Sequence, residues 1–364
     1  MSLCAAAKPQ YLCAPNLALQ YSLIMTQRAA IKAVRSFLPE NKLTNEDLAE
    51  QFGDWHAGQI LSKTGVAVRG IAAADECASD LGVAAAKRLF DEAVCAPDEI
   101  DFLIFCTQSP DYFTPTTACV MQDRLGLRTS CGAVDINQGC SGYIYGLALA
   151  KSLVEAGTAR TVLLVTADTY MKFINRRDRS LLTLFGDGAA ATLMTTVESE
   201  SELVGPFVLG TDGRGASQII VKAGGLRCRP TVENATEKED SSGNWRSDQN
   251  LFMDGADVFS FALRTVPPTL QQLLEKANLT INQIDFMIPH QANKFVLERL
   301  RAKLKFPADK FWIDMENSGN TVSSTIPIAL EGAINQGRVK SGDRVALVGF
   351  GVGYSWGATL IEIV

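Results

Sequence analysis

A polar turn separates two apolar segments, and it reads Asp135-Ile136-Asn137-Gln138-Gly139-Cys140-Ser141-Gly142. The residues that follow, 143–157, carry apolar side chains at helical spacing and end in a glycine. We therefore expect a strand, a tight turn and a buried helix, with Cys140 at the helix entrance. Unpaired backbone N–H groups and the helix dipole favour a nucleophilic thiolate there. A structural role stays open, because a free cysteine often serves as a small core hydrophobe.

The composition is that of a globular protein with a substantial core. The chain has 364 residues, of which 47% are hydrophobic, and its formal net charge is −6. This length allows one large or two medium domains. The acidic balance argues against a nucleic-acid partner, which needs a basic face to neutralise phosphates. Because no run approaches the roughly 18 apolar residues of a membrane span, we expect no membrane partner.

Nine cysteines and two histidines are spread along the chain without a CxxC pair. This pattern contains no zinc-type ligand cluster, and the odd number of cysteines argues against a disulfide framework. We therefore expect a cytoplasmic protein with reduced thiols and no bound metal. Residues 1–28 are expected to form an extension ahead of the fold, since the first 24 residues lack the charged and apolar regions of a signal peptide.

The second half of the chain repeats the pattern of the first. The strand predicted at 99–105 resembles residues 283–289, and an apolar-periodic helix precedes each of them. After each come a second helix and a strand that ends in a polar turn, at 133–140 and at 312–320. A third helix and another apolar strand then follow in both cases. Repetition at this length indicates a duplicated unit.

The duplication predicts two α/β halves of similar fold, residues 29–203 and 204–364. Strands that alternate with helices predict mostly parallel sheets. The corresponding turns of the two halves carry Cys140 and Asn320, and His290 stands at a strand end. Because strand ends form the sites of open parallel sheets, we expect these three side chains to converge.

Four short motifs occur in order: Gly139-Cys140-Ser141-Gly142, His290-Gln291-Ala292-Asn293, Asn317-Ser318-Gly319-Asn320-Thr321 and Gly351-Val352-Gly353-Tyr354-Ser355-Trp356-Gly357. With them, the chain from about Ala29 to Val364 resembles the β-ketoacyl-acyl carrier protein synthase III family of thiolase-fold condensing enzymes. The resemblance implies a thiolase-like fold, in which two duplicated α/β halves with central sheets form five layers, αβαβα. It implies an acyltransferase that condenses an acyl group with malonyl-acyl carrier protein, by decarboxylative Claisen condensation, to a β-ketoacyl thioester. CoA or phosphopantetheine thioesters would be substrates, and no cofactor is implied.

Carried onto this chain, the resemblance makes Cys140 the acylated nucleophile. It makes His290 and Asn320 the pair that binds the thioester carbonyl of the malonyl-type substrate. Decarboxylation leaves an enolate, so two donors aimed at its oxygen lower the barrier. The backbone N–H groups of Cys140 and Gly353 would form the oxyanion hole, with glycine permitting close approach. Two structural roles stay open, a hydrogen-bonded core histidine for His290 and a helix cap for Asn320.

Two further residues match substrate-binding positions of the family. Asn293 would bond the pantetheine arm of the substrate, or else only its own turn. Phe113 matches a position at which the partner of a homodimer reaches into the acyl pocket, although it could equally be an ordinary loop aromatic. The resemblance therefore also implies a homodimer.

The nucleotide-binding positions depart from the family. Members that prefer CoA carry Trp and Arg where this chain has Gln59 and Lys63, whereas Arg179 matches a CoA-binding arginine. Trp55 stands too far along the chain to replace the missing aromatic surface with assurance. The primer would then arrive on a carrier protein, for which the helix after His290 offers a basic surface. Its residues are Lys294, Arg299, Arg301, Lys303 and Lys305.

Two other functions stay open. Gln59 and the polar, aperiodic residues 222–250 are compatible with acyl transfer to a hydroxyl or amine acceptor, without condensation, in a specialised pathway. A long surface segment of this kind is either flexible or covers a pocket. The third function is that of a non-catalytic heterodimer subunit. Such a subunit would have no need of Cys140, His290 and Asn320 together.

Overall fold

The computed structural model describes residues 26–364. Residues 1–25 of the predicted extension lie outside the described residues. The first strand begins at Thr26, so residues 26–28 belong to the fold and not to the extension. Among the described residues, no helix combines the length and the apolar character that crossing a membrane requires.

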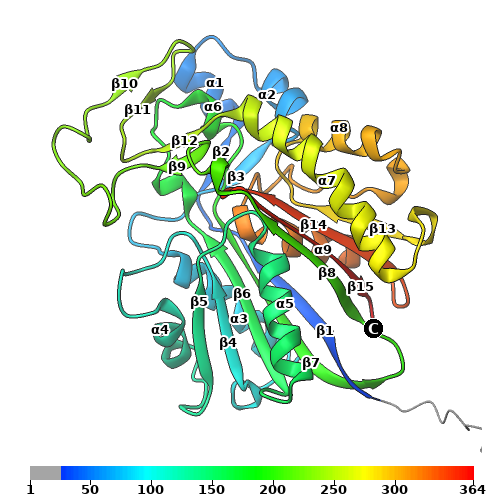
Figure 1. Cartoon of the computed structure of the whole chain (residues 1–364). Coiled ribbons are helices and arrows are strands. Elements are labelled where there is room, and N and C mark those ends of the chain that lie inside the picture. Colours follow the sequence, from blue (N-terminus) through cyan, green and yellow to red (C-terminus); the bar gives the residue numbers. More distant parts are fainter. Residues whose placement is uncertain (1–25) are drawn as a thin grey trace, which may run out of the picture.

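Two mixed sheets lie at the centre of the fold (Figure 1). The first has the order β1-β7-β6-β4-β5, and its strands are β1 (Thr26–Phe37), β4 (Phe102–Cys106), β5 (Gly132–Ile136), β6 (Thr161–Asp168) and β7 (Gly188–Ser199). The second has the order β13-β14-β15-β8, and its strands are β8 (Val204–Thr211), β13 (Phe286–Pro289), β14 (Arg344–Gly351) and β15 (Ser355–Glu362). Short two-stranded pairs are β2 (Lys42–Thr44) with β3 (Val68–Gly70), β9 (Ile219–Val221) with β12 (Leu251–Met253), and β10 (Lys238–Glu239) with β11 (Trp245–Arg246).

The expectation of mostly parallel sheets is wrong. β4 is parallel to both of its neighbours, but the pairs β6–β7 and β7–β1 are antiparallel. In the second sheet only β13 and β14 are parallel. The three-residue turn 352–354 explains one antiparallel pair, since it reverses the chain between β14 and β15 and leaves no room for a crossover helix.

One layer of helices lies between the two sheets and one lies on the outer face of each sheet, which confirms the five-layered αβαβα arrangement. The outer face of the first sheet is covered by α3 (Ala78–Asp91) and α4 (Thr117–Arg124). Between the sheets lie α5 (Gly142–Glu155) and α9 (Thr325–Asn335), as Figure 1 shows for α5. The outer face of the second sheet is covered by α7 (Gly255–Ala277) and α8 (Lys294–Leu304). The short helices α1 (Asn45–Phe52), α2 (Ala57–Thr64) and α6 (Arg179–Leu182) lie in the connections.

The central helices are apolar on more than one face because both sheets contact them. In α5, Ile144 and Leu147 pack in one cluster with Leu164 of the first sheet and Leu347 of the second. The chain crosses from one sheet to the other between Ser199 and Val204. The division into 29–203 and 204–364 stays a prediction, because the central cluster joins residues of both parts in one core.

One element of the predicted repeat is missing from the second half. No strand forms at 312–320, and only two isolated bridges remain at its ends, one between Phe311 and Met287 and one between Asn320 and Phe185. The Gln291 side chain takes the place of a strand ladder here. Its oxygen accepts from the Asp314 N–H at 2.8 Å, and its amide donates to the Pro289 carbonyl at 2.6 Å.

Residues 222–250 are held against the first half of the chain. Arg246 donates to the fully buried carboxylate of Asp178, and the Arg177 guanidinium lies 4.0 Å from the centre of the Trp245 ring. The strands that bracket the segment, β9 and β12, contribute Ile219 and Met253 to the wall of the cavity around Cys140. The segment is therefore anchored beside the site by its ends.

Candidate active site

Cys140 lies in the turn between β5 and α5, as the sequence predicts, and only 7% of its surface is exposed. The Gly142 N–H donates to the Gly139 carbonyl at 2.7 Å and closes the turn. The end of β14 lies directly against the thiol. A Cβ at Gly351 would come within 2.7 Å of the Cys140 Sγ, so a glycine is required for this approach.

His290 and Asn320 come from the second half of the chain. His290 directly follows β13, and its backbone N–H donates to the Val348 carbonyl at 2.7 Å. Its Nδ1 lies 2.7 Å from the Thr325 Oγ1, which leaves Nε2 as the ring nitrogen for a ligand. Asn320 accepts from the Val322 N–H through Oδ1 at 3.0 Å, so its amide nitrogen is the group left to donate.

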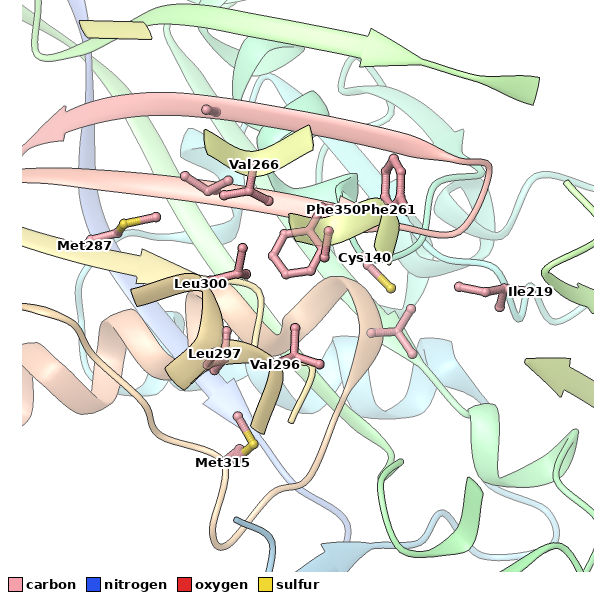
Figure 2. Packing of buried hydrophobic residues seen from close by; sticks show 14 of the residues in the cluster. Cys140, Ile219, Phe261, Val266, Met287, Val296, Leu297, Leu300, Met315 and Phe350 are labelled. Atoms are coloured by element: carbon pink, nitrogen blue, oxygen red, sulfur yellow. The ribbon is translucent and has the colours of Figure 1, made fainter. Parts of the chain in front are cut away.

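The structure brings Cys140, His290, Asn320 and Asn293 to one cavity of about 110 Å³. Its walls are otherwise mostly apolar, and they include Tyr170, Leu184, Phe185, Ile219, Met253, Val258, Phe259, Ala262, Val296 and Phe350. Figure 2 shows Cys140 beside Phe350, with Val296 and Ile219 nearby. A buried apolar cavity with a few convergent polar groups is the usual form of a small-molecule site.

Asn293 has a structural task as well. It is the N-cap of α8, and its Oδ1 accepts from the Val296 N–H at 2.9 Å. Of the two predicted roles of Asn293, the hydrogen bond to its own turn is therefore observed. Asn293 also lines the cavity, and its predicted contact with the pantetheine arm stays a prediction.

The structure places Val352, and not Gly353, beside the Cys140 thiol, and the oxyanion hole itself stays a prediction. Val352 lines the cavity, and its backbone forms a hydrogen bond with the Cys140 thiol. Gly353 belongs to the turn between β14 and β15, where a Cβ would meet the Ser355 nitrogen at 2.7 Å. The glycine-rich motif located the turn correctly, but it does not reveal which of its N–H groups faces the thiol.

Phe113 and Arg179 lie away from the cavity. Phe113 is 86% exposed, on the loop between β4 and α4. Arg179 donates to both carboxylate oxygens of Asp54, at 3.0 and 2.7 Å. Its guanidinium lies 4.8 Å from the centre of the Phe52 ring and 5.8 Å from that of Trp55.

Trp55, which stands too far along the chain to be matched from the sequence, lies close to Gln59 and Lys63, and whether it replaces the missing aromatic surface stays a prediction. Trp55 lines a second cavity, of about 120 Å³, together with Gln59 and Lys63. The helix α2 begins at Ala57, two residues after Trp55, and Gln59 and Lys63 are four residues apart on one face of it. An aromatic ring is therefore present at this place, although it comes from a different sequence position.

Burial sets the protonation of the site in the resting state. Desolvation raises the pKa of Cys140 to about 12, and the backbone of Val352 lowers it only in part. The expectation of a thiolate at Cys140 is therefore wrong for the resting site. Desolvation raises the pKa of the thiol by more than the backbone N–H donors lower it. Burial also lowers the pKa of His290 to about 3, so its imidazole is neutral near pH 7.

We expect alkylation of Cys140 by iodoacetamide to accelerate about tenfold per pH unit from pH 6 to 9, without levelling off. A raised pKa keeps the thiolate fraction small over this range, so the fraction grows in proportion to hydroxide. Mass spectrometry of the Cys140 peptide measures the rate. A small free thiol, which levels off above about pH 8.5, is the control, and a plateau near pH 7 for Cys140 would contradict the expectation.

Two family models and a set of relatives match the sequence of this chain. Residues 134–213 match the model for 3-oxoacyl-[acyl-carrier-protein] synthase III, and residues 274–363 match the model for its C-terminal part. A β-ketoacyl-[acyl-carrier-protein] synthase III from Caldanaerobacter subterraneus is 39% identical over 92% of this chain and 97% of its own length.

Solved structures are similar over the same length. A crystal structure of a 3-oxoacyl-(acyl-carrier-protein) synthase III is 51% identical, with a TM-score of 0.91, over 92% of this chain and all of that chain. The β-ketoacyl-[acyl carrier protein] synthase III from Thermus thermophilus is 35% identical, with a TM-score of 0.80, over 92% of this chain and 98% of that chain.

The fold and the site together define a condensing enzyme of the thiolase-fold class. The comparisons identify one family within this class. The relative and the solved structure both bear the name of the same synthase, and each covers 92% of this chain. The chain belongs to the β-ketoacyl-[acyl-carrier-protein] synthase III family. The resemblance inferred from the four motifs is thereby confirmed.

Proposed function

We propose that this enzyme loads an acyl group on Cys140 and condenses it with malonyl-acyl carrier protein to a β-ketoacyl thioester. The observation that carries the proposal is that Cys140, His290 and Asn320 line one buried, mostly apolar cavity. The names of the relatives support the carrier-bound acceptor. We also propose a cytoplasmic protein that needs no cofactor beyond its thioester substrates.

The first step transfers the acyl group. The Cys140 thiol gives up its proton, its sulfur attacks the thioester carbonyl carbon, and the carbonyl oxygen becomes an oxyanion. The N–H groups of Cys140 and Val352 would donate to this oxygen. The carbon–sulfur bond of the donor then breaks, and the donor leaves as a thiol with the proton. Because Cys140 is a thiol at rest, the proton must leave as the sulfur attacks.

The second step forms the new carbon–carbon bond. The malonyl thioester loses carbon dioxide, and the electron pair of the broken bond becomes an enolate. His290 is neutral, so its Nε2 would donate to the enolate oxygen without a charge, and the Asn320 amide would donate beside it. The enolate carbon attacks the acyl carbonyl on Cys140, the sulfur leaves as a thiolate, and the thiolate takes up a proton from solvent.

The test is intact-protein mass spectrometry with a panel of acyl-CoA and acyl-carrier thioesters, followed by addition of malonyl-acyl carrier protein. We expect an acyl adduct that disappears on addition of the malonyl substrate, with release of labelled carbon dioxide and a β-ketoacyl product. Simple transfer to a hydroxyl or amine acceptor would release no carbon dioxide. An absence of adduct with every donor would contradict the proposal.

We further propose that the second cavity receives the nucleotide end of a CoA donor, against Trp55. We expect Trp55→Ala to raise the KM for acyl-CoA about 3- to 10-fold, because an aromatic contact contributes about 0.5–1.5 kcal/mol. The KM for the same acyl group on a carrier protein should stay unchanged, since that donor carries no adenine. Steady-state kinetics with both donors measures this, and an equal change in both would contradict it.

A carrier protein would dock elsewhere, on the basic face of α8. The exposed cations of α8 lie at its start, in its middle and at its end, and they are Lys294, Arg299, Lys303 and Lys305. Arg301 belongs less to this face, because it is paired with Glu298 at 2.8 Å. The start of α8 lies beside the cavity through Asn293, so an acidic carrier on this face would deliver its arm to Cys140.

We propose a homodimer that forms through β5. This strand is the edge of the first sheet, and its Val134 is 38% exposed. Asp135 accepts from the N–H groups of Thr117 and Ala118, both at 2.7 Å, and so ties the loop of Phe113 to the edge. In such a dimer, Phe113 would be placed to reach the acyl pocket of the partner.

We expect Val134→Lys to convert the dimer to a monomer, because a charge on an edge strand blocks pairing with a second strand. Light scattering at micromolar concentration measures the mass. The matched control is Val232→Lys. Val232 is 91% exposed and belongs to segment 222–250, not to the edge strand β5. A dimer that survives Val134→Lys, or a wild type that is monomeric, would contradict the interface.

A further inference from the structure

The ring of His290 is fixed by a second side chain that has no part in the scheme above. Thr325 is the first residue of α9, and 2% of its surface is exposed, as for His290. Its Oγ1 lies 2.7 Å from the His290 Nδ1. The His290 and Phe350 rings form a T-shaped pair, with 5.6 Å between ring centres and an angle of 87° between the ring planes. The imidazole is therefore held between a hydroxyl and an aromatic ring.

We propose that Thr325 sets the tautomer of His290, by donating its hydroxyl hydrogen to Nδ1 so that Nε2 carries the hydrogen that faces the cavity. Thr325 is thus a positioning residue, which acts on the substrate only through His290. The inference rests on the proposed function, in which His290 must donate to the enolate oxygen.

The hydroxyl has one hydrogen and two acceptors within reach. These are the His290 Nδ1 at 2.7 Å and the Val322 carbonyl at 3.1 Å. If the hydrogen went to Val322, Nδ1 would have to donate to the Thr325 oxygen, and the Nε2 lone pair would face the cavity. That lone pair would repel an enolate oxygen, whereas an Nε2 hydrogen would stabilise it. The shorter contact and the chemistry of the site both favour donation to Nδ1.

The ring can hold only one of these two states at a time. Its pKa is lowered to about 3 by burial, so near pH 7 a single nitrogen carries hydrogen. The partner of one nitrogen therefore determines what the other nitrogen offers. The hydroxyl of Thr325 would therefore determine whether Nε2 can donate to the substrate, although Thr325 itself would not touch the substrate.

The test is the ¹⁵N spectrum of the imidazole in the full-length protein. The chain has two histidines, so a His56→Gln background leaves His290 as the only signal. Protonated and bare ring nitrogens give well separated resonances. We expect a bare Nδ1 and a protonated Nε2 in this background, and a change in that ratio in Thr325→Val, which keeps the shape and removes the hydroxyl.

We expect Thr325→Val to slow malonyl decarboxylation about 100-fold or more, since a wrong histidine tautomer costs about 10⁴-fold in a serine protease triad. Acylation of Cys140 should persist, and Thr325→Ser should restore both the tautomer and the rate. The matched control is Thr269→Val, another buried threonine, whose hydroxyl donates to its own helix at Thr265. This control should change neither measurement.

A hydrogen on Nδ1 in the His56→Gln background would overturn the inference, and so would a Thr325→Val variant with unchanged tautomer and decarboxylation. The tautomer of the background variant answers the question even if Thr325→Val does not fold. Failure of the proposed function has a different signature. The wild type would then release no carbon dioxide, while the spectra would still show whether Thr325 sets the tautomer.

Discussion

Replacement of Cys140 by alanine is expected to abolish the acyl adduct and condensation, yet to leave decarboxylation of a malonyl thioester in place. In the proposed scheme the thiol is the nucleophile of the first step, and among the described residues the cavity wall holds no second cysteine and no serine, threonine or lysine. His290 and Asn320 remain in their positions, because their backbones are held by Val348 and Leu184 and not by Cys140. Intact-protein mass spectrometry and release of labelled carbon dioxide measure the two steps separately.

The control for this experiment is Cys95→Ala. Cys95 is also a buried thiol, 8% exposed, but it packs in the outer cluster with α3. Its loss should leave the adduct unchanged. An adduct that persists in Cys140→Ala, or that vanishes in Cys95→Ala, would show that the nucleophile has been assigned wrongly.

Replacement of His290 or of Asn320 by alanine should have the opposite effect. Each change is expected to reduce decarboxylation about 100- to 1000-fold, the usual cost of one donor to a developing oxyanion. The acyl adduct on Cys140 should still form, because the oxyanion of that step would be bound by the backbone N–H groups of Cys140 and Val352. The half-reactions are followed as for Cys140→Ala.

Two variants control for the histidine and the asparagine. His56→Ala changes an exposed histidine, and Asn317→Ala changes an exposed asparagine of the same motif as Asn320. Neither residue lines the cavity, and both variants should keep their decarboxylation rate. If His290→Ala decarboxylated at the wild-type rate, its assignment as a donor would fail.

The three residues of the site could be predicted because each lies at the end of a strand or in a turn that the sequence marks clearly. Cys140 has glycines on either side, and His290 and Asn320 each belong to a short recognisable motif. The duplicated pattern then implied that these places meet. Turns and apolar runs can be predicted from the sequence, because they depend on residues that are neighbours along the chain.

The errors concern properties that arise only from packing. The pKa of Cys140 is raised by walls that come from distant elements, among them Phe350 and Val296. Trp55 lines the second cavity with Gln59 and Lys63 of α2, and its position along the chain does not indicate this. The strand expected at 312–320 is replaced by hydrogen bonds of the Gln291 side chain. Neither periodicity nor spacing contains these contacts.

The segment Leu184–Gly186 belongs to the half that carries Cys140, yet it holds the backbone of Asn320 from the other half. The Asn320 N–H donates to Leu184 at 2.8 Å, and its carbonyl accepts from Gly186 at 3.1 Å. Asn320 therefore reaches the cavity from one part of the chain while its backbone is held by another part, so a change that displaces Leu184–Gly186 is expected to displace the Asn320 donor relative to Cys140.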